Sequence, residues 1–266
     1  MSGAERIIRA ARADGRAALV GYLPAGYPTV DGSIKQLIAM SEGGCDLLEI
    51  GIPYSDPVMD GPTIQRAVDV ALREGTRIRD VLRVVERVAE AGGAPLVMTY
   101  YNPVLRYGVE AFARDLASAG GLGAITPDLI PDEADEWLAA SETYDLDRVF
   151  LVAPSSTDER IATTAAASRG FLYAASTMGV TGARDAVAAT APRLVARCRR
   201  HTALPIGVGL GVRSADHAAE VAAFADAVIV GSAFVTAAEQ GGAAGVRELA
   251  EGLAEGARRP RPVSTS

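Results

Sequence analysis

The sequence predicts a single (β/α)8 barrel, an α/β fold in which eight parallel strands are each followed by a helix. Short apolar runs alternate with longer amphipathic runs along the chain. The apolar runs lack regularly spaced polar residues, which is typical of strands that are covered on both faces. The length of 266 residues suits one barrel domain better than two small domains.

The eight strands are predicted where short runs are rich in Val, Ile, Leu or Ala. An amphipathic helix within Met1–Asp14 precedes the first strand and is expected to cap the barrel floor. In chain order, the strands are expected at Ala17–Leu23, Leu47–Gly51, Pro95–Tyr100, Gly123–Thr126, Arg148–Val152, Phe171–Ala175, Pro205–Leu210 and Ala227–Val230.

Helical patterns fill the intervals between these strands. The helix over Val30–Met40 begins after Pro28 and Thr29 and stops before two glycines, as helices commonly do. The helix over Asp132–Ala140 has acidic residues in its first turn, where the helix dipole favours them. The other helices are expected at Arg77–Glu90, Val109–Ser118, Asp158–Ala167, Ala191–Arg199, Ser214–Ala223 and Val246–Ala254, with a run from Pro62 and a short extra helix over Ala233–Glu239.

Two connections are longer than simple turns, namely Ile52–Pro62 and Ser176–Thr190. Both follow a strand, so both are expected on the C-terminal rim, where barrel enzymes build their sites. We expect residues 1–257 to form one catalytic barrel domain. The basic, proline-containing residues 258–266 are expected to form a flexible tail.

The charge of the chain excludes several classes of protein. A formal net charge of −7 argues against binding to nucleic acid, whose phosphates attract basic surfaces. The local basic run Arg193–Arg200 is expected to be a solvated helix face. No apolar run approaches the length of about 18 residues that a membrane span needs, and no secretory leader is recognisable. We therefore expect a cytoplasmic protein that does not contact a membrane.

Neither metal chemistry nor histidine chemistry is expected. Cys45 and Cys198 lie far apart in the sequence, whereas a structural zinc needs about four suitably spaced ligands. Both thiols are expected to be reduced. His201 and His217 are expected on the barrel floor and on an outer helix, away from the rim that holds barrel active sites.

Glu49 stands out because it lies between Leu48 and Ile50, near the end of the second predicted strand. An unpaired charged carboxylate in apolar surroundings is costly. One interpretation is a salt bridge to a neighbouring strand or a solvated strand end. The other is a general acid or base whose pKa is raised by desolvation. Position alone favours neither interpretation.

The connection after Glu49 adds a second acid. Prolines and glycines stiffen the loop, and Asp60 precedes Gly61 and Pro62. Asp60 is therefore a candidate N-cap for the helix that starts at Pro62. It is also a candidate site carboxylate beside the strand end, and the two interpretations are compatible.

The segment Leu48–Gln65, LEIGIPYSDPVMDGPTIQ, resembles the signature of the tryptophan synthase alpha subunit family. The order and spacing of further motifs agree with this family over nearly the whole chain. These motifs are Tyr22–Pro28, Met98–Pro103, Pro127–Pro131, Gly179–Gly182 and Gly231–Ala233.

The resemblance implies a retro-aldol cleavage of indole-3-glycerol phosphate to indole and glyceraldehyde 3-phosphate. It implies that Glu49 transfers protons, and that Asp60 holds the indole N–H and stabilises the positive charge that develops on the ring. Tyr173 matches a family tyrosine near the glutamate, although a barrel-interior aromatic residue remains an equal interpretation.

The substrate phosphate is expected at the rim beyond the seventh and eighth strands, as in many barrels. Gly182, Gly211, Gly231 and Ser232 are the expected phosphate-binding residues, because glycine lets the backbone approach an anion and a helix N-terminus offers free N–H groups. Ser232 is also a candidate N-cap, which is compatible with phosphate contact.

The indole ring is expected to lie in an apolar pocket. The resemblance assigns Tyr22, Tyr100 and Leu210 to this pocket, and Tyr22 and Leu210 stand where other members can have Phe. It also places Thr181 to meet Asp60 when the loop closes, so we expect the Ser176–Thr190 connection to become ordered with ligand.

The resemblance also implies a partner, the tryptophan synthase beta subunit, in an α2β2 complex. Pyridoxal phosphate is expected only in that partner, with no cofactor in this chain. The family partner contacts the loop around Pro53–Asp60. Two alternatives remain, a free-standing indole-3-glycerol phosphate lyase and a catalytically silent paralogue that acts as a binding protein, and the intact Glu49 argues against the second.

Overall fold

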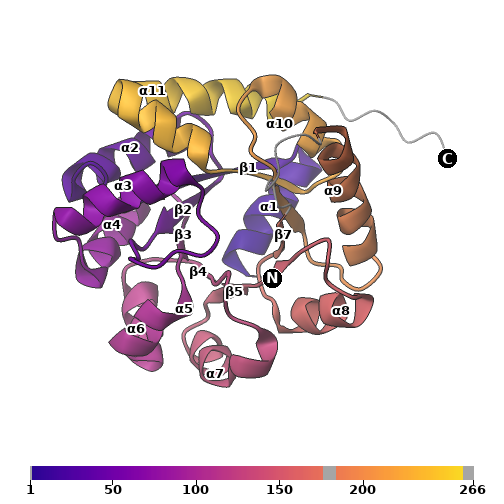
Figure 1. Cartoon of the computed structure of the whole chain (residues 1–266), viewed down its shortest axis with the longest axis horizontal. Helices are drawn as coiled ribbons and strands as arrows, with labels where there is room; N and C mark the ends of the chain where they lie inside the picture. The colour runs from indigo at the N-terminus through magenta and orange to yellow at the C-terminus, as the bar shows by residue number, and fades with distance from the viewer. Residues whose placement is uncertain (1, 176–183, 260–266) are drawn as a thin grey trace.

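The computed structural model describes residues 2–175 and 184–259, without the side chains of residues 184–189. Helices surround a central ring of strands, and α1 lies across one end of that ring (Figure 1). The strands are β1 (Ala18–Pro24), β2 (Leu47–Gly51), β3 (Pro95–Met98), β4 (Gly123–Ile125), β5 (Asp147–Val149), β6 (Leu151–Val152), β7 (Leu172–Ala175), β8 (Ile206–Gly209) and β9 (Ala227–Val230). The helices are α1 (Gly3–Ala13), α2 (Val30–Glu42), α3 (Pro62–Arg73), α4 (Ile78–Glu90), α5 (Tyr101–Tyr107), α6 (Val109–Ser118), the 3-10 turn Pro131–Glu133, α7 (Asp135–Thr143), α8 (Asp158–Ala167), α9 (Arg184–Cys198), α10 (Ala215–Ala222) and α11 (Ser232–Ala257).

The strands form one parallel sheet in the order β5-β4-β3-β2-β1-β9-β8-β7-β6. Its two ends, β5 and β6, are consecutive in the chain and separated only by Phe150. The Val149 carbonyl accepts a hydrogen bond from Thr126 N, and the Phe150 carbonyl accepts one from Tyr173 N, both at 3.2 Å. The two pieces therefore act as one strand bonded on both sides, and the predicted eight-strand barrel is confirmed.

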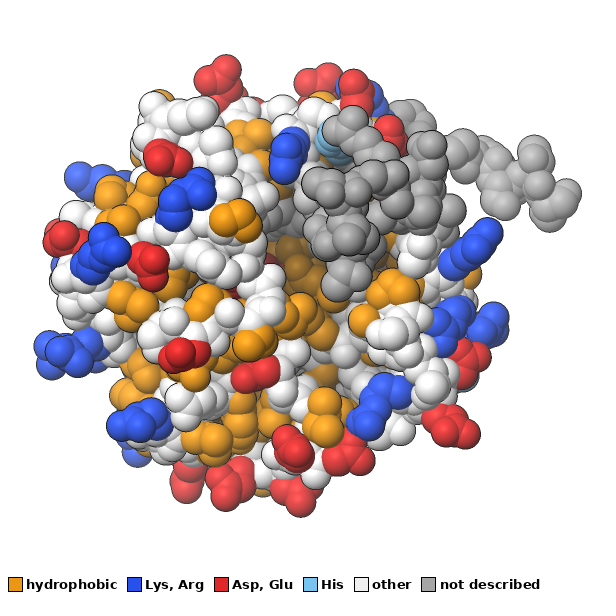
Figure 2. Space-filling model, in the orientation of Figure 1, with side chains coloured by type: hydrophobic (Ala, Val, Ile, Leu, Met, Phe, Trp, Pro, Cys, Tyr) orange, Lys and Arg blue, Asp and Glu red, His pale blue; other side chains and the backbone are white. Residues whose placement is uncertain are grey.

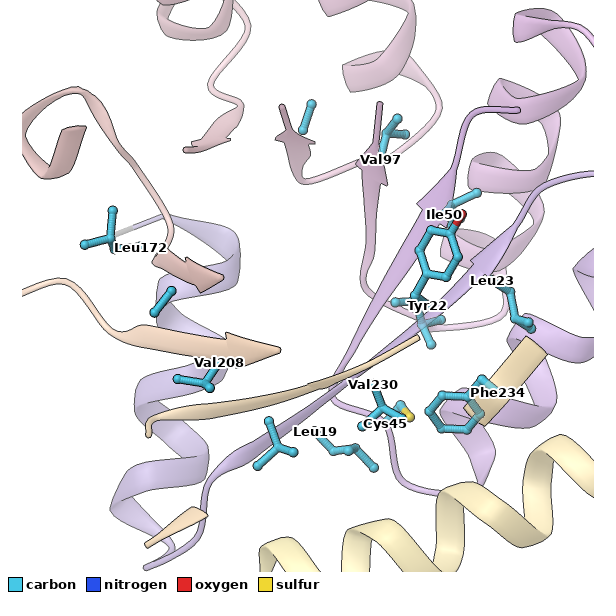
Figure 3. Packing of buried hydrophobic residues seen from close by; sticks show 14 of the residues in the cluster. Leu19, Tyr22, Leu23, Cys45, Ile50, Val97, Leu172, Val208, Val230 and Phe234 are labelled. Carbon is cyan, nitrogen blue, oxygen red and sulfur yellow. The ribbon is translucent and has the colours of Figure 1, made fainter. Parts of the chain in front are cut away.

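Alternation along the strands separates the barrel interior from the layer beneath the helices. Leu47 belongs to an inner cluster that also includes residues of β1, β3, β7, β9 and α1. Leu48 and Ile50 belong to the outer cluster, part of which is drawn in Figure 3. Glu49 shares the strand face of Leu47, so β2 directs this carboxylate into the barrel.

The barrel floor is held by a buried carboxylate, Asp226, just before β9. Its Oδ1 pairs with Arg12 at 2.7 Å and with Arg199 at 3.1 Å, and its Oδ2 accepts a bond from Ile206 N at 2.8 Å. The expectation of a purely solvated basic face is therefore wrong for Arg199. Because Arg12 lies on α1, the contact also fastens the predicted floor helix.

Several element boundaries differ from the sequence predictions. The short helix α5 was not predicted, and α7 begins at Asp135 because Pro131–Glu133 forms a separate 3-10 turn. Helix α9 begins at Arg184 and not at Ala191, so the preceding connection is shorter than expected. The predicted short and final helices meet within α11, at the non-helical backbone of Gly242.

The expected C-terminal tail begins at Arg258, and residues 260–266 lie outside the described part. Within the described ranges, every helix is too short or too polar to cross a membrane.

Candidate active site

Glu49 is the most unusual carboxyl group of the barrel interior. It is 2% exposed, and its Oε1 has no hydrogen-bond partner among the described residues. Burial raises the pKa of Glu49 to about 8, so the side chain is protonated at neutral pH. Both structural interpretations, a salt bridge and a solvated strand end, are wrong within the part of the chain that the structure describes.

Tyr22 lies next to Glu49 on the neighbouring strand, since the two residues are partners in the β1–β2 register. Its buried ring extends along β2 (Figure 3) and lies over Gly51, where an added Cβ would come within 2.5 Å of the Tyr22 hydroxyl. Burial raises the pKa of Tyr22 well above its usual value, and the charges of Asp60 and Glu49 raise it further. The phenol is therefore close to both acids.

Tyr173 enters the barrel interior from β7, where it packs against Phe171 at a ring-centroid distance of 6.3 Å. An added Cβ on Gly209 would lie 2.6 Å from the Tyr173 hydroxyl, so the missing side chain at Gly209 makes room for the phenol. Burial, followed by the charge of Glu49, raises the pKa of Tyr173 well above its usual value. Tyr173 is thus an interior aromatic residue that also lies within electrostatic reach of Glu49.

Asp60 lies at the end of the β2–α3 loop and is half-buried. Burial raises its pKa. The N-cap of α3 is Gly61, without a side-chain cap bond, so the interpretation of Asp60 as the helix cap is wrong. Gln65 Nε2 instead bonds to the backbone carbonyl of Asp60 at 2.8 Å, and the carboxyl group is left for another role.

Tyr100, which follows β3, contacts the loop that bears Asp60. Its hydroxyl accepts hydrogen bonds from the backbone amides of Val58, at 3.2 Å, and Met59, at 2.9 Å. Its ring packs against Tyr54 with the centroids 5.3 Å apart. Tyr100 therefore contacts the loop through both its ring and its hydroxyl, whereas the sequence suggested only a ring-lining role.

The residues expected to bind the phosphate include two glycines, Gly211 and Gly231, and the start of α11. Gly211 has a φ of +62°, a conformation that favours glycine. Gly231 is the N-cap of α11, so the interpretation of Ser232 as N-cap is wrong and Ser232 occupies the first helical position. A Cβ added to Gly231 would be 3.7 Å from the Tyr22 ring, so this helix start lies beside Tyr22.

The remaining predicted site residues divide into two groups. Leu210 is half-buried and packs against the outer cluster. Thr181 and Gly182 lie outside the described residues, as does most of the Ser176–Thr190 connection. His201 is an exposed residue, with its Nε2 3.7 Å from Asp158. Within the described ranges, no group of three or more His, Cys, Asp or Glu residues could hold a metal ion.

Together these residues can perform proton transfer beside a stabilising negative charge. A protonated, buried acid faces the barrel axis, and a second carboxyl group approaches from the loop. The sequence did not reveal that Gly51 and Gly209 provide space for two phenols. Only the contacts between neighbouring strands identify these glycines, because each serves a side chain that is distant in sequence.

Comparisons with known proteins agree over nearly the full length. The family model described as "Tryptophan synthase alpha chain" matches residues 8–258. The chain is 62% identical over 258 residues to the tryptophan synthase alpha chain of Mycobacterium avium, covering 97% of this chain and 95% of the relative. It is 66% identical over 248 residues to that of Nocardia farcinica, covering 93% of each. A solved structure of Mycobacterium tuberculosis tryptophan synthase is similar with a TM-score of 0.92 and 60% identity, covering 97% of this chain and 99% of that chain.

Proposed function

The chain belongs to the tryptophan synthase alpha chain family, and from this premise we propose that Glu49 and Asp60 perform its chemistry as a non-equivalent pair. The family reaction is the lyase step of tryptophan biosynthesis that cleaves indole-3-glycerol phosphate to indole and glyceraldehyde 3-phosphate. The observation that best supports the assignment is the buried Glu49 carboxyl group without a bond to its Oε1 among the described residues.

The first step is protonation of the indole ring. Glu49, with its pKa raised to about 8, is in the acid form at neutral pH and donates its proton to C3. Positive charge then develops at the ring nitrogen. Asp60, approaching from the loop, accepts a hydrogen bond from that N–H and stabilises the charge, which lowers the energy of the transition state in a site of low dielectric constant.

The second step cleaves the carbon–carbon bond. Glu49, now a carboxylate, takes the proton from the hydroxyl on the carbon that becomes the aldehyde. The O–H electrons form the carbonyl bond, and the C–C electron pair returns to the ring, which neutralises it. Glu49 ends the cycle protonated again. Tyr173 is proposed to assist, since its phenol lies within electrostatic reach of Glu49.

The rest of the substrate is proposed to lie across the same rim. Gly211, Gly231 and Ser232 would bind the phosphate through backbone N–H groups and the first turn of α11, with Gly182 completing this site. Tyr22, Tyr100 and Leu210 would line the indole pocket, and Thr181 would meet Asp60 on closure. Residues 1–257 would form this catalytic unit.

An apolar surface on this rim supports the proposal that a second protein binds there. The large hydrophobic side chains that are exposed in the described residues follow β2, β3 and β4, and Val58 is 78% exposed. One of them, Leu105, also lines an open pocket of about 420 Å³ beside α5, and hydrophobic side chains are visible on this face of the molecule in Figure 2. We propose that a tryptophan synthase beta subunit covers this surface in an α2β2 complex and holds pyridoxal phosphate itself. The exposed residues are Val58, Met59, Leu105 and Ile130.

The deciding experiment measures cleavage of indole-3-glycerol phosphate by the full chain, with and without a beta subunit, in steady state. Strong activation by the beta subunit is the expected result. High activity alone without activation would instead identify a free-standing lyase. Absence of cleavage under both conditions would overturn the proposed activity and leave a binding role. The reaction is proposed to occur in the cytoplasm, with the buried Cys45 and Cys198 reduced.

A further inference from the structure

Two backbone amides of the loop that bears Asp60 bond to a single phenol oxygen, the hydroxyl of Tyr100. The backbone amides of Val58 and Met59 both point at the Tyr100 hydroxyl, at 3.2 and 2.9 Å. Asp60 directly follows Met59 in the chain. An amide N–H can only donate, so the phenol oxygen acts as the acceptor for both. The Tyr100 side chain is buried, and the two bonds are partly buried.

Tyr100 is itself held in place from several directions. The amide of the following residue, Tyr101, donates to the Asp128 carboxylate at 3.0 Å. The ring packs against Tyr54, whose hydroxyl accepts a bond from Asn102 Nδ2 at 3.2 Å. Tyr54 precedes the anchored amides in the same loop. The loop is therefore fixed to the start of α5 on both sides of its tip.

We propose that Tyr100 is a positioning residue that fixes Asp60 for the reaction through two backbone amides of the loop, in addition to lining the indole pocket. The inference rests on the proposed function of Asp60. A carboxylate stabilises the developing ring charge only if it is held at the right place before the reaction, since a mobile group must be reorganised at each turnover. The hydroxyl thus acts on the transition state more than on substrate binding.

The phenol is also electrostatically coupled to the acid that it positions. Burial raises the pKa of Tyr100, and the charge of Asp60 raises it further, while the loop amides lower it. Tyr100 thus stays protonated and keeps one O–H donor beside Asp60 after accepting the two amide bonds. Phenylalanine at this position would keep the ring and remove only the oxygen.

The test is Tyr100→Phe in the full chain, assayed with saturating beta subunit. We expect kcat for indole-3-glycerol phosphate cleavage to fall about tenfold while KM changes less than about twofold, because two hydrogen bonds that position the loop are lost. In an Asp60→Asn background, the same change should lower kcat less than about twofold, since the group being positioned is already gone. Full additivity of the two effects would overturn the proposal.

Amide exchange provides a readout that does not depend on activity. The amides of Val58 and Met59 should exchange with deuterium about tenfold faster in Tyr100→Phe, while core amides stay protected and so report an intact fold. The matched control is Tyr107→Phe. The Tyr107 hydroxyl donates a hydrogen bond to Asp115 at 2.7 Å, and neither residue belongs to the loop. The control should change neither kcat nor loop exchange.

The outcomes separate the two proposals. Loop exchange that is unchanged in Tyr100→Phe overturns the anchoring role, whatever the activity. If the wild-type chain does not cleave the substrate but the loop amides respond as expected, the anchoring contact stands and the proposed function fails, and with it the role of Tyr100 in the reaction. An equal loss of kcat in Tyr107→Phe would also overturn the proposal, because the effect would then be a general consequence of removing a tyrosine hydroxyl.

Discussion

Two buried carboxyl groups at opposite ends of the barrel, Asp226 and Glu49, differ in their hydrogen bonding. Asp226 on the floor is 0% exposed and has three partners, Arg12, Arg199 and the amide of Ile206. Glu49 near the rim is 2% exposed, and its Oε1 has no partner among the described residues. Burial is therefore the same at both ends, and hydrogen bonding differs. An acid with satisfied bonds stabilises the fold, whereas a buried acid without them is a candidate for chemistry.

The difference has a simple electrostatic cause. Two guanidinium groups and an N–H contact the Asp226 carboxyl group and compensate its loss of water. Glu49 has no such compensation, so its pKa rises to about 8 and it holds a proton at neutral pH. The floor acid thus joins α1 to the residue that follows α9, while Glu49 near the rim holds a proton.

The largest expected effect comes from Glu49→Gln. This change should slow cleavage of indole-3-glycerol phosphate about a thousandfold, because glutamine can neither donate nor accept the proton. The measurement is kcat with saturating beta subunit. Glu86→Gln on the exposed face of α4 is the matched control and should keep the parent rate. If Glu49→Gln cleaved the substrate as fast as the parent, Glu49 would not be the proton-transfer residue, and the proposed difference between Glu49 and Asp226 would fail.

The pH dependence of stability tests the same contrast without substrate. The pKa of Glu49 rises from 4.5 to about 8 on folding, so between these values the folded state binds a proton that the unfolded state releases. Stability should therefore fall as pH rises through this window. Relative to Glu49→Gln, the parent should lose on the order of 3 kcal/mol of unfolding free energy between about pH 5 and about pH 8. Urea unfolding of both proteins at several pH values measures this loss. A difference in unfolding free energy that stays constant with pH would contradict the raised pKa of Glu49.

The floor acid should affect stability and not chemistry. Asp226→Asn should lower the free energy of unfolding by about 2 to 3 kcal/mol, because it leaves Arg12 and Arg199 without their counter-charge. The matched control is Asp31→Asn, since Asp31 pairs with Arg83 at 2.9 Å on the surface, and it should cost less than about 0.5 kcal/mol. Equal losses in the two variants would show that burial of the pair contributes nothing.

The fold could be predicted because its signals are local. Continuous apolar strands and amphipathic helices repeat along the chain, and even the strand that divides at Phe150 was recognised as one run. The start of α9 at Arg184 was not predicted, and Pro192 lies inside this helix, where proline is usually unfavourable. Helix α5 was missed because its sequence resembles a rim motif and shows little periodicity.

The candidate site was only partly predictable. The residue types at Glu49 and Asp60 suggested acids in a site, but the sequence could not separate a salt-bridged Glu49 from a protonated one. That distinction depends on which side chains other strands place nearby. The contact of the Tyr100 hydroxyl with the loop amides joins residues about 40 positions apart, and no local pattern reveals it.

The side chains and the backbone amides of Val58 and Met59 have different environments. Their side chains are exposed on the rim, while their amides point inward to one oxygen of Tyr100. A neighbouring protein that covers these side chains therefore acts on the same peptide units that hold the loop, one residue from Asp60. Any coupling between docking and the position of the loop is a free energy and is therefore reciprocal. If a docked partner strengthens the bonds of the loop amides to Tyr100, those bonds must favour docking by the same free energy.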